Sequence, residues 1–355
     1  MIRGRLRVAA PSLVVAILLP AVATADSADR TADYARLVEE YRRGKGDAAI
    51  RQLLTWRGDV LAVALGDAVL PRDHHSIITP GSFPAAIMLH TEAGLRLNYE
   101  GKGLRAVAHW LVAEKIARAP YSLERPAFLR EWYHALGEYF MGSYRDGDAV
   151  PLLEQGRTQF PNDFSIALTL GRAYEVQGTF SEGAMRSAWS DPSEADREYL
   201  AKAEAAYRSA LASNAESTEA RLHLGRVLQF SRQAEAGIVE LRRAAATAGD
   251  PRSRYLADLF IGDQLLHLGA ESQREEARQA LERALDAWPA GQAAALSLAQ
   301  SLHASGLRAE AAQVLEGVAA GAKEGEDPFR TYLFGDPTQE RPLLERVKAL
   351  AQDRR

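Results

Sequence analysis

The chain has 355 residues, of which 47% are hydrophobic and 25% charged, and its formal net charge is −4. Such a balance is typical of a water-soluble protein with enough apolar residues for a large core, and it provides no basic surface for nucleic acid. The sequence contains no cysteine, which excludes disulfide bonds and a thiol nucleophile.

Residues 1–25 have the three-part layout of a secretory signal peptide. Arginines come first, an apolar run follows over residues 13–19, and the small residues Ala23 and Ala25 precede Asp26. The apolar run is too short to cross a bilayer comfortably. We therefore expect an exported protein, periplasmic or secreted, that begins at Asp26 and has no stable membrane insertion after cleavage. An uncleaved membrane anchor is the alternative.

Residues 26–129 are expected to form irregular helical hairpins. Apolar residues at i, i+3 and i+4 spacing predict two helix pairs, 33–43 with 47–56 and 84–101 with 104–120. A long connector that contains prolines, residues 65–83, separates the two pairs.

Five of the eight histidines fall between residues 74 and 134. They are His74, His75, His90, His109 and His134. No two of them have the i, i+4 spacing that places two imidazoles on one face of a helix. We interpret them as structural or solvent-facing histidines. The alternative is a periplasmic binding or accessory subunit that holds a small ligand, a metal or a glycan in this region.

A glycine recurs within predicted helices of similar sequence. The stretch "LTLGRAYEVQG" (168–178) is matched in part by "LHLGRVL" (222–228), so that Gly171 and Gly225 lie 54 residues apart. A glycine within a helix costs about 1 kcal/mol relative to alanine. We interpret it as the point where two helices cross closely, and we expect alanine to be tolerated there and leucine to destabilise the fold.

The spacing around these glycines resembles that of the tetratricopeptide repeat, a pair of antiparallel helices. The frame fits five consecutive units over residues 130–325, and the small residue of each unit is Gly137, Gly171, Gly225, Gly262 and Ala299. The resemblance implies an all-α fold, a right-handed α-solenoid of antiparallel helix pairs. It also implies that residues 26–129 are irregular hairpins of the same kind.

The second unit carries an insertion of about 20 residues at 184–202. Asp191 is predicted as the N-cap of a lengthened second helix, with Pro192 at its first position, and helical spacing continues to Ser213. Trp189 in the preceding loop either packs against the neighbouring helix or serves as a docking anchor. No β pattern is visible anywhere.

Residues 326–355 are expected to form a turn followed by a capping helix. The stretch "DPFRTYLFGDPT" (327–338) is rich in turn formers, and Pro342 is predicted to start an amphipathic helix. Because a solenoid needs its last apolar face covered, we expect this helix to lie over the end of the array.

Motifs that carry chemistry are scarce. Gly101 and Gly103 imitate part of a dinucleotide-binding turn, but the segment before them is predicted to be helical rather than a buried strand. The sequence holds no G-x-S-x-G, Walker or H-E-x-x-H motif. We therefore expect no catalysis, no cofactor and no metal.

The resemblance implies that the first helices of successive units line a concave groove. Carried over to this chain, the groove-lining residues are Glu131, His134, Glu138, Arg172, Glu175, Arg226, Gln229, Phe230, Asp263, His267, Gln300 and His303. This face is polar and of mixed charge, which favours a peptide or an extended segment of a protein partner. We expect a scaffold or adaptor in the bacterial cell envelope; the identity of its partner and its oligomeric state stay open.

Two arginines of this groove, Arg172 and Arg226, occupy equivalent positions in adjacent units, between Glu138 and Asp263. One interpretation is a ladder of exposed ion pairs, each of which contributes only about 0–1 kcal/mol. The other is a central site for an acidic peptide segment, because two guanidinium groups can bind carboxylates bidentately.

Overall fold

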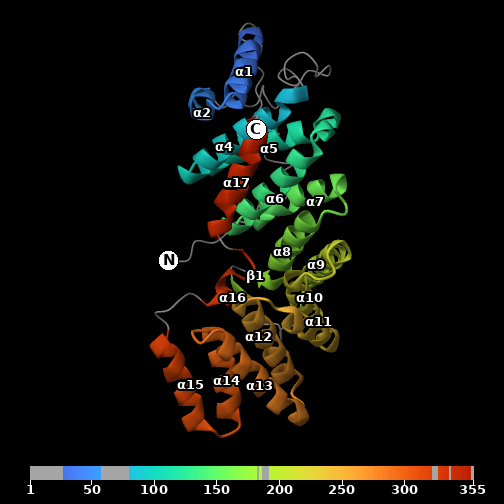
Figure 1. The fold of residues 1–355 in the computed structure, drawn as a ribbon, viewed down its shortest axis with the longest axis vertical. Helices are drawn as coiled ribbons and strands as arrows, with labels where there is room; N and C mark the ends of the chain where they lie inside the picture. The colour runs from blue at the N-terminus through green and yellow to red at the C-terminus, as the bar shows by residue number, and fades with distance from the viewer. Residues whose placement is uncertain are drawn as a thin grey trace. The chain divides into compact units, whose positions relative to one another are not determined.

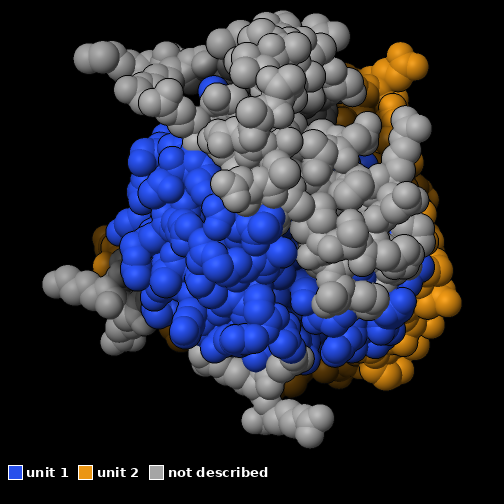
Figure 2. All heavy atoms as spheres, turned by 90° about the horizontal axis from the view of Figure 1, so that it is seen from above, with its two compact units in different colours: residues 1–135, 338–355 blue, residues 136–337 orange. Residues whose placement is uncertain are grey.

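The part of the chain that the computed structural model describes is mostly helical, which confirms the expected all-α fold. The residues that it describes are 27–56, 80–181, 184–185, 192–321, 327–335 and 337–352. The expected signal segment, most of the connector and Trp189 lie outside them. The chain divides into two compact units, unit 1 (residues 1–135 and 338–355) and unit 2 (residues 136–337) (Figure 1; Figure 2).

Unit 1 is made of helices and short 3-10 turns. They are α1 (Ser27–Arg42), α2 (Gly46–Thr55), η2 (Pro80–Ser82), α4 (Phe83–Tyr99), α5 (Gly103–Ala117), η3 (Pro120–Glu124), the first part of α6 (Pro126–Gly142) and nearly all of α17 (Pro337–Ala351). The two helix pairs that the sequence predicts are present as α1 with α2 and α4 with α5.

Polar contacts in the core of unit 1 join three helices. The indole of Trp110 on α5 donates a hydrogen bond to the backbone oxygen of Thr91 on α4, and the indole of Trp132 on α6 donates to Thr91 Oγ1. A Cβ at Gly94 would overlap the ring of Trp110. The glycine therefore allows the close approach of α4 and α5.

The last helix, α17, belongs to unit 1, so the expectation that it covers the end of the repeat array is wrong. Lys348 Nζ lies 2.8 Å from Glu92 Oε1 on α4. Arg346 Nη2 lies 3.6 Å from Glu131 Oε2 on α6. These ion pairs hold α17 against α4 and α6, and the apolar pattern of α17 does not predict them.

Unit 2 is a series of five antiparallel helix pairs. They are the end of α6 with α7 (Asp146–Gln159), α8 (Phe164–Thr179) with α9 (Glu194–Ser213), α10 (Thr218–Phe230) with α11 (Ala234–Thr247), α12 (Pro251–Leu268) with α13 (Glu271–Ala287), and α14 (Gln292–Ala304) with α15 (Arg308–Gly321). The unit also contains the strands β1 (Phe180–Ser181) and β2 (Ala184–Met185) and the short helix α16 (Pro328–Thr331).

The recurring glycines lie where the two helices of a pair meet, as the sequence predicts. A Cβ placed on each of them would lie only 2.5–2.6 Å from a large side chain of the second helix. The pairs are Gly137 with Leu153, Gly171 with Tyr207, Gly225 with Leu241, and Gly262 with Leu281. Alanine carries that Cβ, so these contacts oppose the expectation that alanine is tolerated at these positions.

Three helices converge on Gly225 of α10. A Cβ at Gly237 on α11 would lie 2.7 Å from the backbone oxygen of Gly225. That same oxygen accepts a hydrogen bond from Gln264 Nε2 on α12, at 3.2 Å. The glycine pair thus brings α10 and α11 close together and leaves the carbonyl open to α12.

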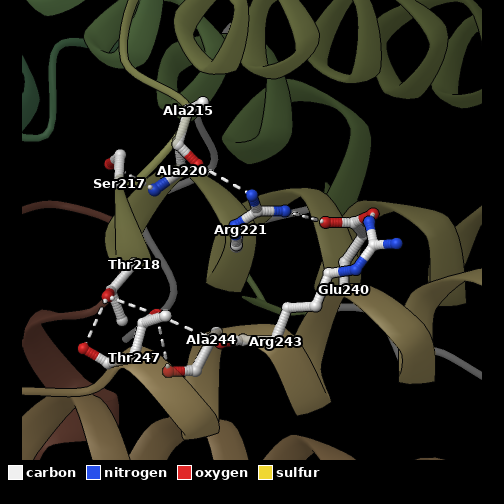
Figure 3. Close-up of polar contacts among 9 residues, drawn as sticks. All are labelled: Ala215, Ser217, Thr218, Ala220, Arg221, Glu240, Arg243, Ala244 and Thr247. Carbon is white, nitrogen blue, oxygen red and sulfur yellow. Dashed lines mark hydrogen bonds and ion pairs between the residues drawn. The ribbon is translucent and has the colours of Figure 1, made fainter.

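The start of α10 is fixed by its own cap and by a salt bridge to α11 (Figure 3). Ser217 Oγ accepts the backbone N–H of Ala220 at 3.1 Å, which satisfies one of the free donors of the first turn. Arg221 Nη1 donates to Glu240 Oε2 on α11 at 2.8 Å, and Nη2 donates to the backbone oxygen of Ala215 at 2.7 Å. These bonds attach α10 both to its partner helix and to the loop before it.

Two helices begin at other residues than expected. The N-cap of α9 is Ser193 and not Asp191, because Ser193 and Asp196 form a capping box that satisfies two backbone donors. Helix α17 begins at Pro337 and contains Pro342 in its interior. Proline at a first helical position has no N–H that needs a partner, which suits Pro337.

A short antiparallel ladder joins β1 and β2, although the sequence shows no β pattern. Phe180 pairs with Met185, and Ser181 pairs with Ala184. Strands of two residues are too short to produce the alternation of apolar and polar side chains by which a strand is recognised.

Candidate functional site

A segment near the C-terminus lies against the helices of unit 2. We call residues 327–335 the resident segment; α16 forms its first half. Its side chains and backbone contact α8, α10 and α12, and we call the contacted side chains of these helices the docking surface. Figure 1 shows α16 beside α12 and the end of α8. The sequence predicts only a turn in this stretch.

The first residue of the resident segment, Asp327, is anchored by two hydrogen-bond donors from other parts of unit 2 and by one from its own turn. Its carboxylate accepts from the Tyr255 hydroxyl at 2.9 and 3.0 Å, and from the backbone N–H of Ala293 at 2.8 Å. The N–H of Phe329 also donates to it, at 2.8 Å. Only 4% of Asp327 is exposed, and the positive end of α14 favours its negative charge.

Two aromatic side chains of the resident segment pack against aromatic residues of α10 and α12. The ring of Tyr332 stacks on His223, with centroids 4.3 Å apart and planes at 17°. Phe260 meets the rings of both Tyr332 and Phe329 edge-on, at 5.0 and 6.0 Å. Such arrangements suit the quadrupoles of aromatic rings and make the contact specific for aromatic side chains.

The hydroxyl of Tyr332 reaches a buried carboxylate, that of Glu175 on α8. Tyr332 Oη donates to Oε1 at 3.0 Å, Tyr207 Oη donates to Oε2 at 2.6 Å, and His223 Nδ1 lies 2.9 Å from Oε2. Glu175 is only 1% exposed. Burial, followed by the charge of Glu175, raises the pKa of both tyrosines well above its usual value, so the hydroxyls stay protonated and act as donors.

Arg172 on α8 binds the backbone of the resident segment. Its Nε donates to the carbonyl of Leu333 at 3.1 Å, and its Nη1 lies 2.9 Å from Glu138 Oε1. Its Nη2 is buried and has no hydrogen-bond partner. A Cβ at Gly335, where φ is +81°, would lie 2.5 Å from that nitrogen, so this position of the segment accepts only glycine without rearrangement.

The end of the resident segment rests on two further aromatic residues. The ring of Phe334 lies 4.6 Å from that of Tyr144, between α6 and α7, and 5.5 Å from that of Phe180 in β1. The segment therefore runs from the start of α14 to the end of α8.

The structure brings together half of the residues predicted for the groove. Those at or beside the docking surface are Glu138, Arg172, Glu175, Arg226, Gln229 and Phe230, of which all but Glu138 are buried. Asp263 is half-buried, whereas His267, Gln300 and His303 are exposed. Glu131 and His134 belong to unit 1.

The two arginines do not form an open site for acidic side chains. Arg172 already pairs with Glu138, as the ladder interpretation expects, and this pair is largely buried rather than exposed. The guanidinium of Arg226 lies over the rings of Phe230 and Phe260, at 4.9 and 4.8 Å. Burial raises the pKa of Asp263, and the charge of Arg226 opposes this.

Nothing in the sequence marks several residues of this site as functional. Tyr207, His223, Tyr255 and Phe260 occupy apolar or neutral helix positions, and the hydrogen bond to Leu333 involves only its backbone. The resident segment itself has a recognisable sequence feature, the aromatic spacing Phe-x-x-Tyr-x-Phe-Gly in a stretch that also contains turn formers. This spacing could have indicated that the segment packs against other parts of the chain.

In unit 1, His90 and His109 form a buried pair. Their Nδ1 atoms lie 3.0 Å apart, and His90 Nε2 lies 3.1 Å from the hydroxyl of Tyr34. Burial lowers the pKa of His109 to about 4 and that of His90 well below its usual value. Among the described residues no three His, Asp or Glu side chains are grouped as a metal site would require. His74 and His75 lie outside the described residues.

No helix within the described ranges has both the length and the apolar character needed to cross a membrane.

No known protein family profile and no curated protein matches the chain. Among solved structures, the MamA protein is 20% identical over 56% of this chain and 96% of that one, with a TM-score of 0.41. PilF of Pseudomonas aeruginosa is 17% identical over 62% and 90%, with a TM-score of 0.45. The tetratricopeptide protein TTC0263 of Thermus thermophilus is 16% identical over 61% and 99%, with a TM-score of 0.39.

Proposed function

We propose that this chain is a non-catalytic scaffold that binds another protein through a short peptide segment of that partner. One observation supports this above the others: the docking surface already holds a polypeptide segment, the resident segment, by its backbone and its side chains. A surface that accepts one polypeptide segment in this way has the chemistry to accept another.

The contacts of the docking surface are those by which proteins bind peptides. Arg172 recognises a main-chain carbonyl, Glu175 a hydroxyl, and Phe260 a pair of aromatic rings. A buried arginine and aromatic side chains are also the residue types that dominate binding energy at protein interfaces. None of these groups is arranged as a nucleophile with an adjacent base.

We further propose that the scaffold acts in the cell envelope after export. The support is the layout of residues 1–25, with its arginines, its short apolar run and its small-residue exit. N-terminal sequencing of the protein from an envelope fraction tests this. A mature chain that starts at Asp26 is the expected result, and an intact Met1 would contradict cleavage.

The proposed binding is tested by affinity capture from an envelope extract, with and without a synthetic peptide of residues 327–335. A partner that uses the docking surface is expected to be displaced by this peptide and to stay bound when the peptide sequence is scrambled. Partners that both peptides leave in place would refute binding at this surface.

A further inference from the structure

We propose that the resident segment is an internal competitor, which occupies the docking surface until a partner segment of similar chemistry replaces it. The inferred partner segment has the pattern Asp-x-Phe-x-x-Tyr-x-Phe-Gly, in which the acidic and aromatic residues and the glycine repeat those of residues 327–335. This inference rests on the proposed function and adds the class of partner and the way in which access is regulated.

The resident segment is an addition to the helix pairs rather than part of their packing. Four of the five repeat pairs have an interface in which a glycine of the first helix meets a large side chain of the second, as at Gly171 and Tyr207. The resident segment belongs to none of these interfaces. Its departure would therefore leave the contacts between paired helices in place.

The contacts of the resident segment include hydrogen bonds that water or another peptide can replace. When Tyr332 leaves, Glu175 keeps the hydroxyl of Tyr207 and the imidazole of His223. When Leu333 leaves, Arg172 keeps Glu138. The charged groups of the docking surface thus remain paired while the surface is open, and they do not oppose the exchange of one segment for another.

Each position of the inferred pattern meets a defined group. The acid meets the hydroxyl of Tyr255 and the N–H of Ala293. The first two aromatic residues meet Phe260, and the tyrosine hydroxyl reaches Glu175.

The glycine passes closely over a guanidinium. A Cβ at Gly335 would lie 2.5 Å from Arg172 Nη2, and this nitrogen is buried without a partner. Arg172 Nη2 can therefore donate a hydrogen bond to a backbone oxygen of a partner segment, if that segment lies slightly differently from the resident segment.

The tether gives the resident segment an advantage over a free peptide of the same sequence. A segment tethered by a short linker has an effective concentration on the order of millimolar. If the free segment bound with a dissociation constant of about 10 µM, occupancy by the tethered copy would weaken the apparent affinity about 100-fold. Only a partner with additional contacts, or one that is present at high local concentration, would overcome this.

The test compares peptide binding to the full wild-type chain and to an opened variant, F329S/Y332S. The probe is a fluorescently labelled synthetic peptide of residues 327–335, and the readout is fluorescence anisotropy. The matched control is L315S, which alters an exposed apolar residue of α15. We expect the opened variant to bind the probe about 100-fold more tightly than the wild type, and the control to behave as the wild type.

Specificity is tested with two altered probes on the opened variant. A probe that carries the change Tyr332→Ser loses the contact with Glu175, and one that carries Gly335→Ala meets the guanidinium of Arg172. Each is expected to bind at least about ten-fold more weakly, the loss of one good buried contact. Equal binding of all three probes would overturn the inferred pattern.

Two results would overturn internal competition itself: equal binding of the probe by wild type and opened variant, or no binding by an opened variant whose circular dichroism is native. If F329S/Y332S does not fold, the milder variant D327N is used in its place. We expect D327N to bind the probe with an affinity between those of the wild type and a fully opened chain. An affinity for the probe equal to that of the wild type would count against the inference. A different result would refute the proposed function alone: the probe binds the opened variant, but it displaces no envelope protein in the capture experiment.

Discussion

The change Gly225→Ala tests the packing of the repeats most severely, because helix propensity and packing predict opposite signs. In an exposed helix the change would stabilise by about 1 kcal/mol. Here the added Cβ would lie 2.6 Å from Leu241 Cγ and 3.0 Å from the backbone oxygen of Gly237. Overpacking of this kind costs about 1–3 kcal/mol for each well-packed site, and neither the branched carbon nor the backbone can yield easily. After the gain in helix propensity is subtracted, we expect a net loss of about 1 kcal/mol.

The assay is thermal unfolding followed by far-ultraviolet circular dichroism, with Gly317→Ala as the matched control. Gly317 also lies within a helix, α15, but nothing lies within 4 Å of its added Cβ. For a unit of this size about 1 kcal/mol shifts the melting temperature by about 2–4 °C. We expect Gly225→Ala to lower the melting temperature by about 2–4 °C and Gly317→Ala to raise it slightly. A rise in both variants would refute the close crossing of α10 and α11.

Three further predictions concern charged and titratable groups. Arg172→Ala removes the guanidinium that pairs with Glu138, whose carboxylate then keeps the Thr169 hydroxyl but no longer this cation. We therefore expect a loss of about 3 kcal/mol in urea unfolding, part of which returns when Glu138 is also replaced by alanine. Asp327→Ala removes the anchor of the resident segment, and limited proteolysis should cut residues 327–335 faster than in the wild type; an unchanged rate would contradict the anchoring role. The lowered pKa values of His90 and His109 mean that the folded state binds fewer protons than the unfolded one. The free energy of unfolding should therefore fall as the pH drops from about 6.5 towards 4, by roughly 2 kcal/mol at pH 5 for His109 alone, and replacement of both histidines by glutamine should flatten this slope in a pH series of melting curves.

Much of the fold could be predicted because the repeat leaves a local mark. A glycine within a helix is costly, so its recurrence with apolar neighbours at Gly171 and Gly225 indicates a close helix crossing wherever it appears. The residue at which a helix starts is harder to predict from the sequence than the crossing of two helices. Two acidic or hydroxyl residues near one another, as at Asp191 and Ser193, both suit an N-cap, and only the reciprocal bonds with Asp196 decide between them.

The candidate site could be predicted only in part, because its decisive contacts join residues far apart in the chain. The groove-lining pattern assigned Arg172 and Glu175 to one face, and both contact the resident segment, but the pattern could not show that this surface is covered. The hydrogen bond from Arg172 to the carbonyl of Leu333 has no sequence signature, since every residue has a carbonyl. The destination of α17 depends likewise on Glu92, which lies in a distant helix.

The central claim, that the docking surface takes up an aromatic peptide segment, is tested most directly by amide hydrogen exchange. The chain is isotopically labelled, and an excess of unlabelled peptide of residues 327–335 is added. We expect exchange of the labelled resident segment to accelerate while α8, α10 and α12 remain protected, because the peptide replaces the segment on the same surface. Exchange of residues 327–335 of the wild type that the peptide leaves unchanged at saturating concentration would contradict the account.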